Sequence, residues 1–374
     1  MVLRNLTVVR APPRLSLGKR LGLSAAGLGL AATGLGSLSG PGQDFLQGVS
    51  SYFHDRQGIA QVEINPEARP LLPSDHLKVI TYNIEEGGRD VPAVEKFLKS
   101  EHPDVVLLQE ASVATGRTLA HDLKMNSAYS GNWKIVLSRY PIEGAESKNY
   151  PVSDLERVRR AVNTWTGEPL EVRGLLDVTI RDGTQDVHVI DSHLSTQEPD
   201  WMAREYRTLG DHVATLEAAG AKVIAGGDFN SDLALAKPGR DAPGTPTDTA
   251  NEYLARYRRP VGLMGDPAVQ QAAARFAGEM KDGWVTSPDV SVTLHGARLT
   301  PDEAAAELAA GRGGDDAQRA EDGITHLGAA GRIDGLFASP NLSPERSRVN
   351  QDLRASDHQP LVGEFGGVLN VLGG

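Results

Sequence analysis

The sequence predicts an α/β fold in which strands outnumber helices and the helices are interspersed among them. Short apolar runs of strand length recur along the chain, and stretches with the apolar spacing of helices lie between several of them. With 374 residues, 40% of them hydrophobic, the chain can bury a large core. We expect one domain rather than two, because the candidate site residues run from Asn83 to His358.

The first part of this domain has the order strand, helix, strand. Residues 77–83 are expected to form a strand, residues 91–100 have helical spacing, and residues 104–109 form a second, apolar strand. Residues 135–138 look like a further strand that closes on the turn at residues 139–141.

The next elements lead to the middle of the chain. Residues 174–180 and 187–192 have the pattern of a β-hairpin that turns at Asp182 and Gly183. Residues 201–219 follow with the core spacing of a helix, which leads into a short buried strand at residues 223–225.

The pattern changes after that strand. Proline, glycine and threonine cluster at residues 237–249, and residues 311–322 are polar. Helical spacing returns at residues 253–258, 269–280 and 301–310. We expect residues 233–324 to form a surface insertion between two core strands.

The N-terminal segment resembles a signal peptide or a membrane anchor. Five basic residues precede an uncharged stretch at residues 21–38, which ends on small residues. Because this stretch approaches the ~20 residues of a spanning helix, both a cleaved signal and an anchor that holds the protein at a membrane remain open. We expect export, with residues 1–40 as signal or anchor, residues 41–74 as a lead-in segment and residues 75–367 as the folded domain.

Charge and cysteine content exclude several classes of function. The formal net charge is −11 and the pI is near 5.4, so a broad basic surface for polyanions is not expected. The chain has no cysteine, which excludes disulfides, thiolate zinc sites and cysteine nucleophiles. A phosphate-bearing substrate would therefore need a bound cation.

The stretch KVIAGGDFNSD at residues 222–232 is the strongest local signal for chemistry. A buried strand ends there on two glycines and is followed by Asp228 and Asn230, which lie two positions apart and so project to the same side of an extended segment. A strand that runs into an Asx turn is the ordinary interpretation of such a stretch by itself. Five other apolar runs also carry a ligand-type residue at one end, which favours a metal and phosphate site.

Six motifs together resemble the endonuclease/exonuclease/phosphatase superfamily, which includes DNase I, exonuclease III, sphingomyelinases and inositol polyphosphate 5-phosphatases. In chain order they are TYNIE (residues 81–85), LLQE (107–110), SHLS (192–195), GDFN (227–230), RIDG (332–335) and SDHQP (356–360). The ordered set is more specific than any one motif. The resemblance covers residues 77–365 and implies a four-layered α/β sandwich, in which helices flank two central mixed β-sheets and the site lies at one edge.

The resemblance also implies a set of metal ligands. By position, Glu110 resembles the principal ligand, Glu85 and Asp357 resemble supporting carboxylates, and Asn83 resembles an amide that positions phosphate and water beside the metal. Hard oxygen ligands around an open site suit Mg²⁺, with Mn²⁺ as the alternative ion.

The resemblance also implies a set of catalytic residues. Asp228 resembles the group that orients or deprotonates the attacking water, and Asn230 resembles a positioning amide. His358 resembles the imidazole that contacts the phosphate, Asp334 its carboxylate partner and His193 a second histidine on the phosphate side.

The function expected from this set is that of a magnesium-dependent phosphoric ester hydrolase, in which an activated water attacks in line. A phosphodiesterase similar to the nucleases or sphingomyelinases is favoured over a phosphomonoesterase that acts on an inositol-phosphate-like substrate. A catalytically inactive binding module on the same fold is the alternative from another class. Nucleic acid, a phospholipid head group and a soluble phosphate ester all remain open as substrates, and the sequence indicates no obligate protein partner.

Two positions depart from the pattern of the superfamily or of one of its branches, and a few others are candidates for contact with substrate. Gly335 stands where many members of the superfamily carry an aromatic residue, and His193 is a histidine that the abasic-site repair branch usually lacks. Arg160 and Arg173 are candidates for phosphate contact, although an arginine near a strand is more often a surface ion-pair partner. Trp133, Trp201 and Trp284 are candidates for a substrate platform, although core packing is the more ordinary role of a tryptophan.

Overall fold

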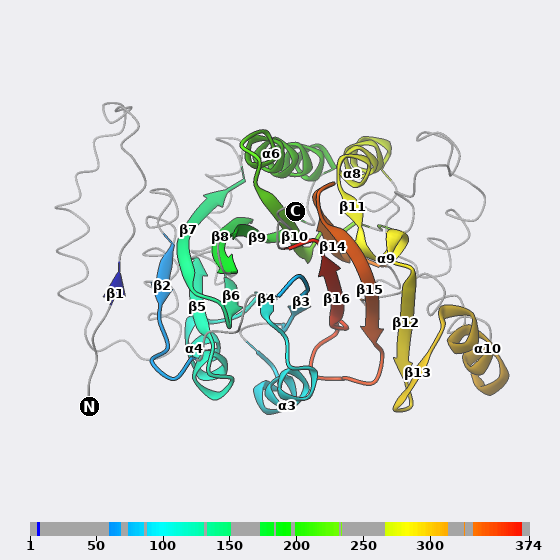
Figure 1. Cartoon of the computed structure of the whole chain (residues 1–374). Coiled ribbons are helices and arrows are strands. Elements are labelled where there is room, and N and C mark those ends of the chain that lie inside the picture. The colour runs from blue at the N-terminus through cyan, green and yellow to red at the C-terminus, as the bar shows by residue number, and fades with distance from the viewer. Residues whose placement is uncertain are drawn as a thin grey trace, which may run out of the picture.

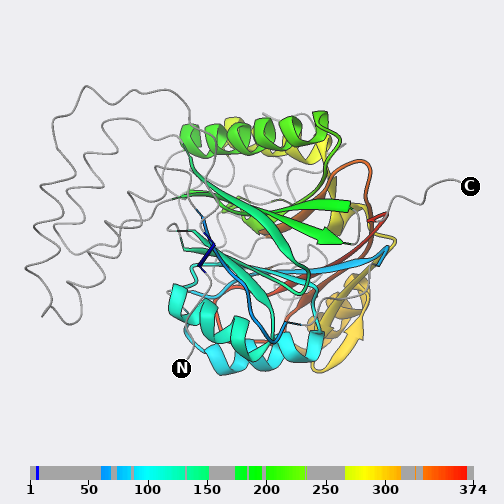
Figure 2. The same ribbon diagram turned by 60° about the vertical axis from the view of Figure 1, so that its left-hand side comes forward.

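The computed structural model describes residues 6–7, 60–68, 74–85, 88–130, 133–150, 173–182, 185–195, 199–231, 233, 266–312, 325 and 332–368. Two mixed β-sheets pack face to face, and helices cover the outer face of each (Figures 1 and 2). This arrangement confirms the predicted four-layered α/β sandwich.

The first sheet has ten strands and joins the two ends of the domain. Its order is β1 (Leu6–Thr7), β2 (Gln61–Glu63), β5 (Asn126–Ser130), β6 (Lys134–Ser138), β4 (Val105–Gln109), β3 (Leu77–Asn83), β16 (Leu361–Gly366), β15 (Ser343–Asn350), β12 (Asp289–Leu294) and β13 (Ala297–Leu299). Strand β3 pairs in parallel with β4 and antiparallel with β16.

The second sheet has six strands. Its order is β11 (Lys281–Asp282), β14 (Asp334–Ala338), β10 (Lys222–Asp228), β9 (Gln185–His193), β8 (Gly174–Asp182) and β7 (Ile142–Asn149). Strand β10 is central, parallel to β9 and antiparallel to β14. This register places Asp228 beside His193 on one side and beside Asp334 on the other.

Two helices pack on each sheet. Helices α3 (Val91–Glu101) and α4 (Val113–Asp122) cover the first sheet, and α6 (Pro199–Ala218) and α8 (Pro267–Glu279) cover the second (Figure 1). Helices α9 (Gly283–Thr286) and α10 (Pro301–Arg312) lie near the edge strands. The Asp90 side chain accepts a hydrogen bond from the Ala93 amide and so caps the start of α3.

Alternating side chains divide the apolar residues into three cores. Leu107 and Val136 of the first sheet meet Leu176, Ile224 and Leu336 of the second in the core between the sheets. The opposite faces of the two sheets pack against the helices in two outer cores. Since both faces of each sheet are buried, the central strands are apolar along most of their length.

The segment expected to be a surface insertion contributes to the core where the structure describes it. Helix α8 buries Val269 and Phe276 against α6 and the second sheet, while β12 extends the first sheet. The helix expected at residues 253–258 lies outside the described residues. The N-terminal segment, apart from the two residues of β1, also lies outside the described residues. Export therefore stays a prediction. Within the described ranges, no helix combines the length and apolar character needed to cross a membrane.

Candidate active site

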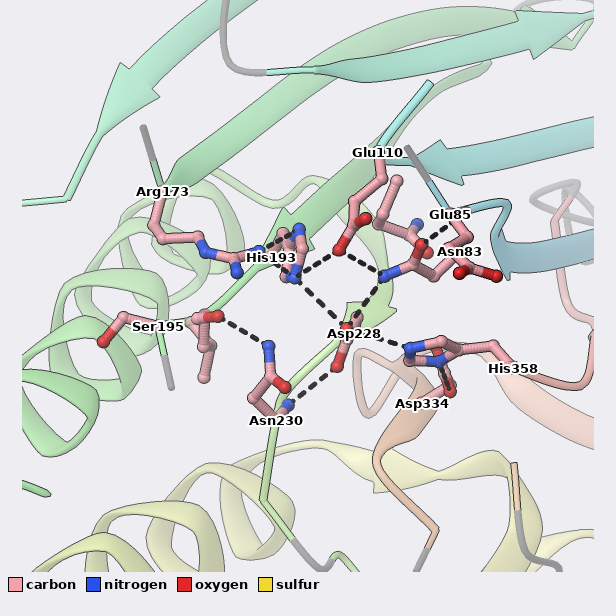
Figure 3. A network of polar contacts seen from close by, with 12 residues as sticks. Asn83, Glu85, Glu110, Arg173, His193, Ser195, Asp228, Asn230, Asp334 and His358 are labelled. Carbon is pink, nitrogen blue, oxygen red and sulfur yellow. Dashed lines mark hydrogen bonds and ion pairs between the residues drawn. The ribbon is translucent and has the colours of Figure 1, made fainter. Parts of the chain in front are cut away.

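Strand ends from both sheets bring the predicted polar residues together at one edge of the sandwich. Asn83 ends β3, and Glu110 follows directly after the neighbouring parallel strand β4. His193 and Asp228 end the parallel strands β9 and β10 of the second sheet. Figure 3 shows their side chains turned toward one another, so the site lies between the two sheets.

The Asp228 carboxylate lies at the centre of this network. Its Oδ2 accepts a hydrogen bond from Asn83 Nδ2 at 3.1 Å and lies 3.1 Å from His193 Nε2 and 3.6 Å from His358 Nε2. Its Oδ1 accepts the backbone N–H of Asn230 at 2.9 Å. Burial raises the pKa of Asp228, but the charges of His193 and His358 outweigh burial and hold the pKa well below its usual range. Asp228 is therefore a carboxylate at neutral pH.

The Glu110 carboxylate, which also lies in the site, is more exposed to solvent than that of Asp228. Its side chain is 29% exposed, and its Oε1 accepts a hydrogen bond from Asn83 Nδ2 at 3.1 Å. Asn83 thus donates to Glu110 and Asp228, while its own Oδ1 accepts from the Glu85 backbone N–H at 3.0 Å. In this arrangement Asn83 links the two carboxylates as a hydrogen-bond donor.

Glu85 and Asp357 lie at the margin of the site. The Glu85 carboxylate is 3.2 Å from the Arg89 guanidinium, and the exposed Asp357 lies 3.4 Å from the Ser356 hydroxyl. Neither belongs to the groups of metal-type ligand atoms that come within 4.8 Å of one another among the described residues. Their predicted role as supporting carboxylates stays a prediction.

His358 and Asp334 form the expected histidine–carboxylate pair. His358 Nδ1 lies 2.8 Å from Asp334 Oδ2, and the Asp334 backbone N–H donates to the Thr325 hydroxyl at 2.9 Å. Burial lowers the pKa of His358, but the charges of Asp334 and Asp228 reverse this and raise it to about 10. At neutral pH His358 is therefore an imidazolium that faces the site through Nε2.

Arg173, which the sequence offered as a candidate for phosphate contact, lies in the site. It is only 6% exposed and its guanidinium contacts the His193 ring, because Gly174, the next residue, pairs with His193 across β8 and β9. Burial and the charge of Arg173 lower the pKa of His193. A buried cation beside a neutral imidazole suits an anionic substrate. In the sequence, the one indication that Arg173 belongs to the site is its position immediately before an expected strand.

A family model described as the Endonuclease/Exonuclease/phosphatase family matches residues 80–358, well over half of the chain. The chain belongs to this family. Its members are generally hydrolases that act on phosphoester bonds and depend on a divalent metal. No curated protein matches the chain.

Solved structures with similar folds include an endonuclease/exonuclease/phosphatase from Beutenbergia cavernae, at 21% identity and a TM-score of 0.48 over 78% of this chain and 71% of that one. The TDP2 of D. rerio, complexed with single strand DNA product, is 16% identical with a TM-score of 0.47 over 78% of this chain and 100% of that one. An endonuclease/exonuclease/phosphatase from Bacteroides vulgatus is 14% identical with a TM-score of 0.45 over 78% and 98% of the two chains.

The donor set of this family member fits a divalent metal. Ligand atoms of Glu110, His193 and Asp228 lie within 4.8 Å of one another, and so do those of Asp228, Asp334 and His358. The first group is the better fit to Mg²⁺ or Mn²⁺, because it contains the partly exposed Glu110 oxygens, whereas His358 of the second group is already cationic.

Two glycines of the family motifs are required by close packing. Gly227 has a φ of 139°, and a Cβ there would lie 1.8 Å from the Ser192 carbonyl oxygen. At Gly335 a Cβ would lie 2.6 Å from the Phe337 ring and 2.8 Å from the Leu233 side chain. The space beside Asp334 is therefore filled by neighbouring side chains, which leaves no room for a side chain at Gly335.

The backbone at the site is unusual. Among the described residues, seven other than glycine have a positive φ, and four of them surround the site. These are Glu85 (56°), Glu110 (53°), Trp133 (60°) and Asn230 (47°). Such conformations cost ~1–3 kcal/mol each and persist where surrounding structure imposes them.

Proposed function

We propose that this protein is a divalent-metal-dependent phosphodiesterase, in which a water held at Asp228 attacks the phosphorus in line with the leaving group. The observation that carries the proposal is the convergence on one buried carboxylate of Asn83, His193, His358 and the Asn230 amide. A structural ion pair would need only one of these partners.

The charges around Asp228 separate into two groups. Glu110 lies on one side, where it would hold the metal together with Asp228, with Glu85 and Asp357 as supporting carboxylates and His193 as a histidine on the phosphate side. The metal supplies charge stabilisation on the phosphoryl oxygens. Arg173 and the His358 imidazolium provide positive charge from the protein itself.

Each residue then has a defined role. Asp228 orients or deprotonates the attacking water, since it is an ionised carboxylate that several hydrogen-bond donors hold in place. The Asn230 side chain donates to the Leu194 carbonyl at 2.9 Å, which fixes the loop that follows β10. His358 donates from Nε2 to a phosphoryl oxygen, and Asp334 keeps its ring charged and oriented.

The proposal is tested with purified protein, bis(4-nitrophenyl) phosphate as a diester and 4-nitrophenyl phosphate as a monoester. We expect faster hydrolysis of the diester in Mg²⁺ or Mn²⁺, complete loss of activity in EDTA and recovery when metal is added back. Full turnover in the chelator contradicts metal dependence, and faster cleavage of the monoester favours the monoesterase alternative.

The His358→Ala variant distinguishes an enzyme from an inactive binding module. Removing a group that acts on the reacting phosphate should reduce kcat by ~10²–10⁴-fold. Circular dichroism must show an unchanged fold, because an unfolded variant is uninformative. A folded variant that keeps most of the activity rejects the assignment.

A further inference from the structure

Trp133 lies next to the candidate metal ligand Glu110. Strands β4 and β6 run antiparallel, and the last pair of their ladder is Gln109 with Lys134. Glu110 follows Gln109 and Trp133 precedes Lys134, so both residues lie directly beyond the end of this ladder. The Ala111 backbone N–H donates to the Trp133 carbonyl at 3.2 Å, so the two chain segments stay together beyond the ladder.

Neither burial in a core nor a favourable backbone conformation explains the tryptophan at position 133. It is 45% exposed, whereas Trp284 is 5% exposed in the core between the sheets. Its φ of 60° places a bulky residue in the left-handed region, which glycine or asparagine would adopt at lower cost. Neither core packing nor backbone preference explains a tryptophan here, and residues held in this way cluster at functional sites.

We propose that the Trp133 ring is a stacking platform for a nucleobase of the substrate, next to the scissile phosphate. This inference rests on the phosphodiesterase function proposed above and adds the chemical class of the substrate. An exposed indole offers a flat apolar face, and stacking on such a face accepts any base.

The surroundings of Trp133 favour a nucleobase over a lipid membrane as its binding partner. The other large exposed apolar residues among the described ones are Ile64 and Val285. Ile64 follows β2, whose register places it beyond Ser127, at the end of β5 away from the β5–β6 turn. Val285 belongs to α9, which contacts β15, four strands from β6. A membrane-binding surface needs a contiguous apolar patch, which these three separate residues do not form.

The net charge also favours recognition of a single nucleotide over a long nucleic acid. At −11 the chain is poorly suited to hold the many phosphates of a long nucleic acid by charge alone. Recognition through one stacked base beside one phosphate needs no basic surface. The substrate class is thus a nucleotide diester, in which one ester group carries a nucleoside.

Two diesters with the same leaving group test the platform directly. They are 4-nitrophenyl thymidine 5′-phosphate and 4-nitrophenyl methyl phosphate, of which only the first carries a base. The best variant is Trp133→Gly, because glycine adopts a φ of 60° without strain and the backbone beside Glu110 is kept. We expect KM for the thymidine ester to rise about tenfold, within the range of base stacking on aromatic side chains, and kinetics with the methyl ester to stay unchanged.

Control variants separate stacking from a structural role. Trp133→Phe should restore most of the preference for the thymidine ester, and Ile64→Ala should leave both substrates unaffected. Equal losses on both esters in Trp133→Gly, with no rescue by phenylalanine, would mean that the residue only supports Glu110 and would overturn the inference.

Fluorescence gives a readout that does not need turnover. Thymidine 5′-monophosphate should quench the tryptophan emission of the inactive His358→Ala protein, and this quenching should fall when Trp133→Phe is added. If neither diester is hydrolysed but the quenching is seen, the proposed function fails and the platform stands. Quenching that is absent, or a blue shift of Trp133 emission only with sphingomyelin vesicles, overturns the nucleobase assignment.

Discussion

At the residue scale, the charge of His358 depends chiefly on Asp334. The pair is buried and closed by a 2.8 Å contact, and the pKa of His358 is raised to about 10. Replacing the carboxylate with an amide removes the largest source of that increase while burial, which lowers the pKa, remains. The imidazolium should then be lost as the pH rises through neutrality, whereas the wild type keeps it.

We therefore expect Asp334→Asn to lose more of its kcat/KM at about pH 8 than at about pH 6, since an unperturbed histidine has a pKa near 6.5. The measurement is a pH profile of diester hydrolysis in saturating metal. Glu345→Gln is a suitable control, because it alters the exposed carboxylate that pairs with His76. An Asp334→Asn profile parallel to that of the wild type would refute the role given to this pair.

Some residues of the site could be predicted from the sequence more readily than others. His193, Asp228, Asn230, Asp334 and His358 were predicted from motifs and come together in the structure, although their catalytic roles stay predictions. Arg173 and Trp133 were recognised only as weak candidates. Arg173 precedes Gly174, which pairs with His193, and Trp133 precedes Lys134, which pairs with the residue before Glu110. Such strand register is not visible in the local pattern.

At the scale of the strand, Gly227 sets the distance between β9 and β10. A side chain there would collide with the Ser192 carbonyl oxygen and force apart the two strands that carry His193 and Asp228. We expect Gly227→Ala to lower Tm and to lose most of the activity. Gly220→Ala is the matched control, because Gly220 also has a positive φ, 82°, but nothing lies within 4 Å of its added Cβ.

The control should show only the backbone cost of an alanine at positive φ, with activity retained. Equal Tm losses in the two variants, measured by thermal denaturation, would mean that the close approach of β9 and β10 is unimportant. A fully active Gly227→Ala protein would contradict the tight packing at the site.

A second polar cluster joins α6 to the second sheet away from the site. Asp177 Oδ1 is 3.0 Å from His188, its Oδ2 is 2.9 Å from His212, and Lys148 Nζ donates to the other nitrogen of His212 at 2.7 Å. Glu146 lies 3.4 Å from Lys148. The lysine already supplies a positive charge here, which makes the cluster a structural network rather than a metal site.

This cluster should make stability depend on pH. Burial raises the pKa of Asp177, but hydrogen bonds from His188 and His212 outweigh it and lower the pKa. Burial lowers the pKa of His188, and Asp177 raises it. The Asp177 contribution is lost as the pH falls below about 4, and the His188 contribution is lost as the pH rises above about 6.5 through the raised value.

The free energy that Asp177→Asn removes should consequently be larger at about pH 5.5 than at about pH 8.5, where His188 is becoming neutral. Denaturant unfolding of variant and wild type at both pH values checks this expectation. Asp289→Asn serves as a surface control, since Asp289 pairs with exposed arginines. A pH-independent difference for Asp177→Asn would exclude the ion pair with His188.

Elements with strong apolar patterns were predicted and those with polar ones were not. Strands β3, β4, β6, β8, β9 and β10 and helices α3, α6, α8 and α10 occur close to the expected residues. Strands β5, β7 and β15 read NSAYS, IEGAESKN and SPERSRVN, which resemble loops. They are strands because neighbouring strands pair with them, and this tertiary preference overrides local composition.

For the whole molecule, the negative net charge predicts how the protein responds to salt. A protein that neutralises many phosphates loses affinity steeply as salt rises, because bound counterions are released from the nucleic acid. With a net charge of −11, we expect a shallow salt dependence for this chain and weak binding to long duplex DNA. Fluorescence anisotropy with labelled DNA across a salt series measures both. A steep slope would reveal a surface that neutralises many phosphates and would weaken the case for recognition of a single nucleotide.

The interleaving of the chain's two ends has a consequence during protein synthesis. Strand β16 lies between β3 and β15 in the first sheet, and β14 lies beside β10 in the second, so late segments complete sheets that early segments begin. A growing chain that has emerged only as far as Asp228 lacks Asp334, His358 and β16, the antiparallel partner of β3. The candidate site therefore cannot be assembled before nearly all of the chain has been made.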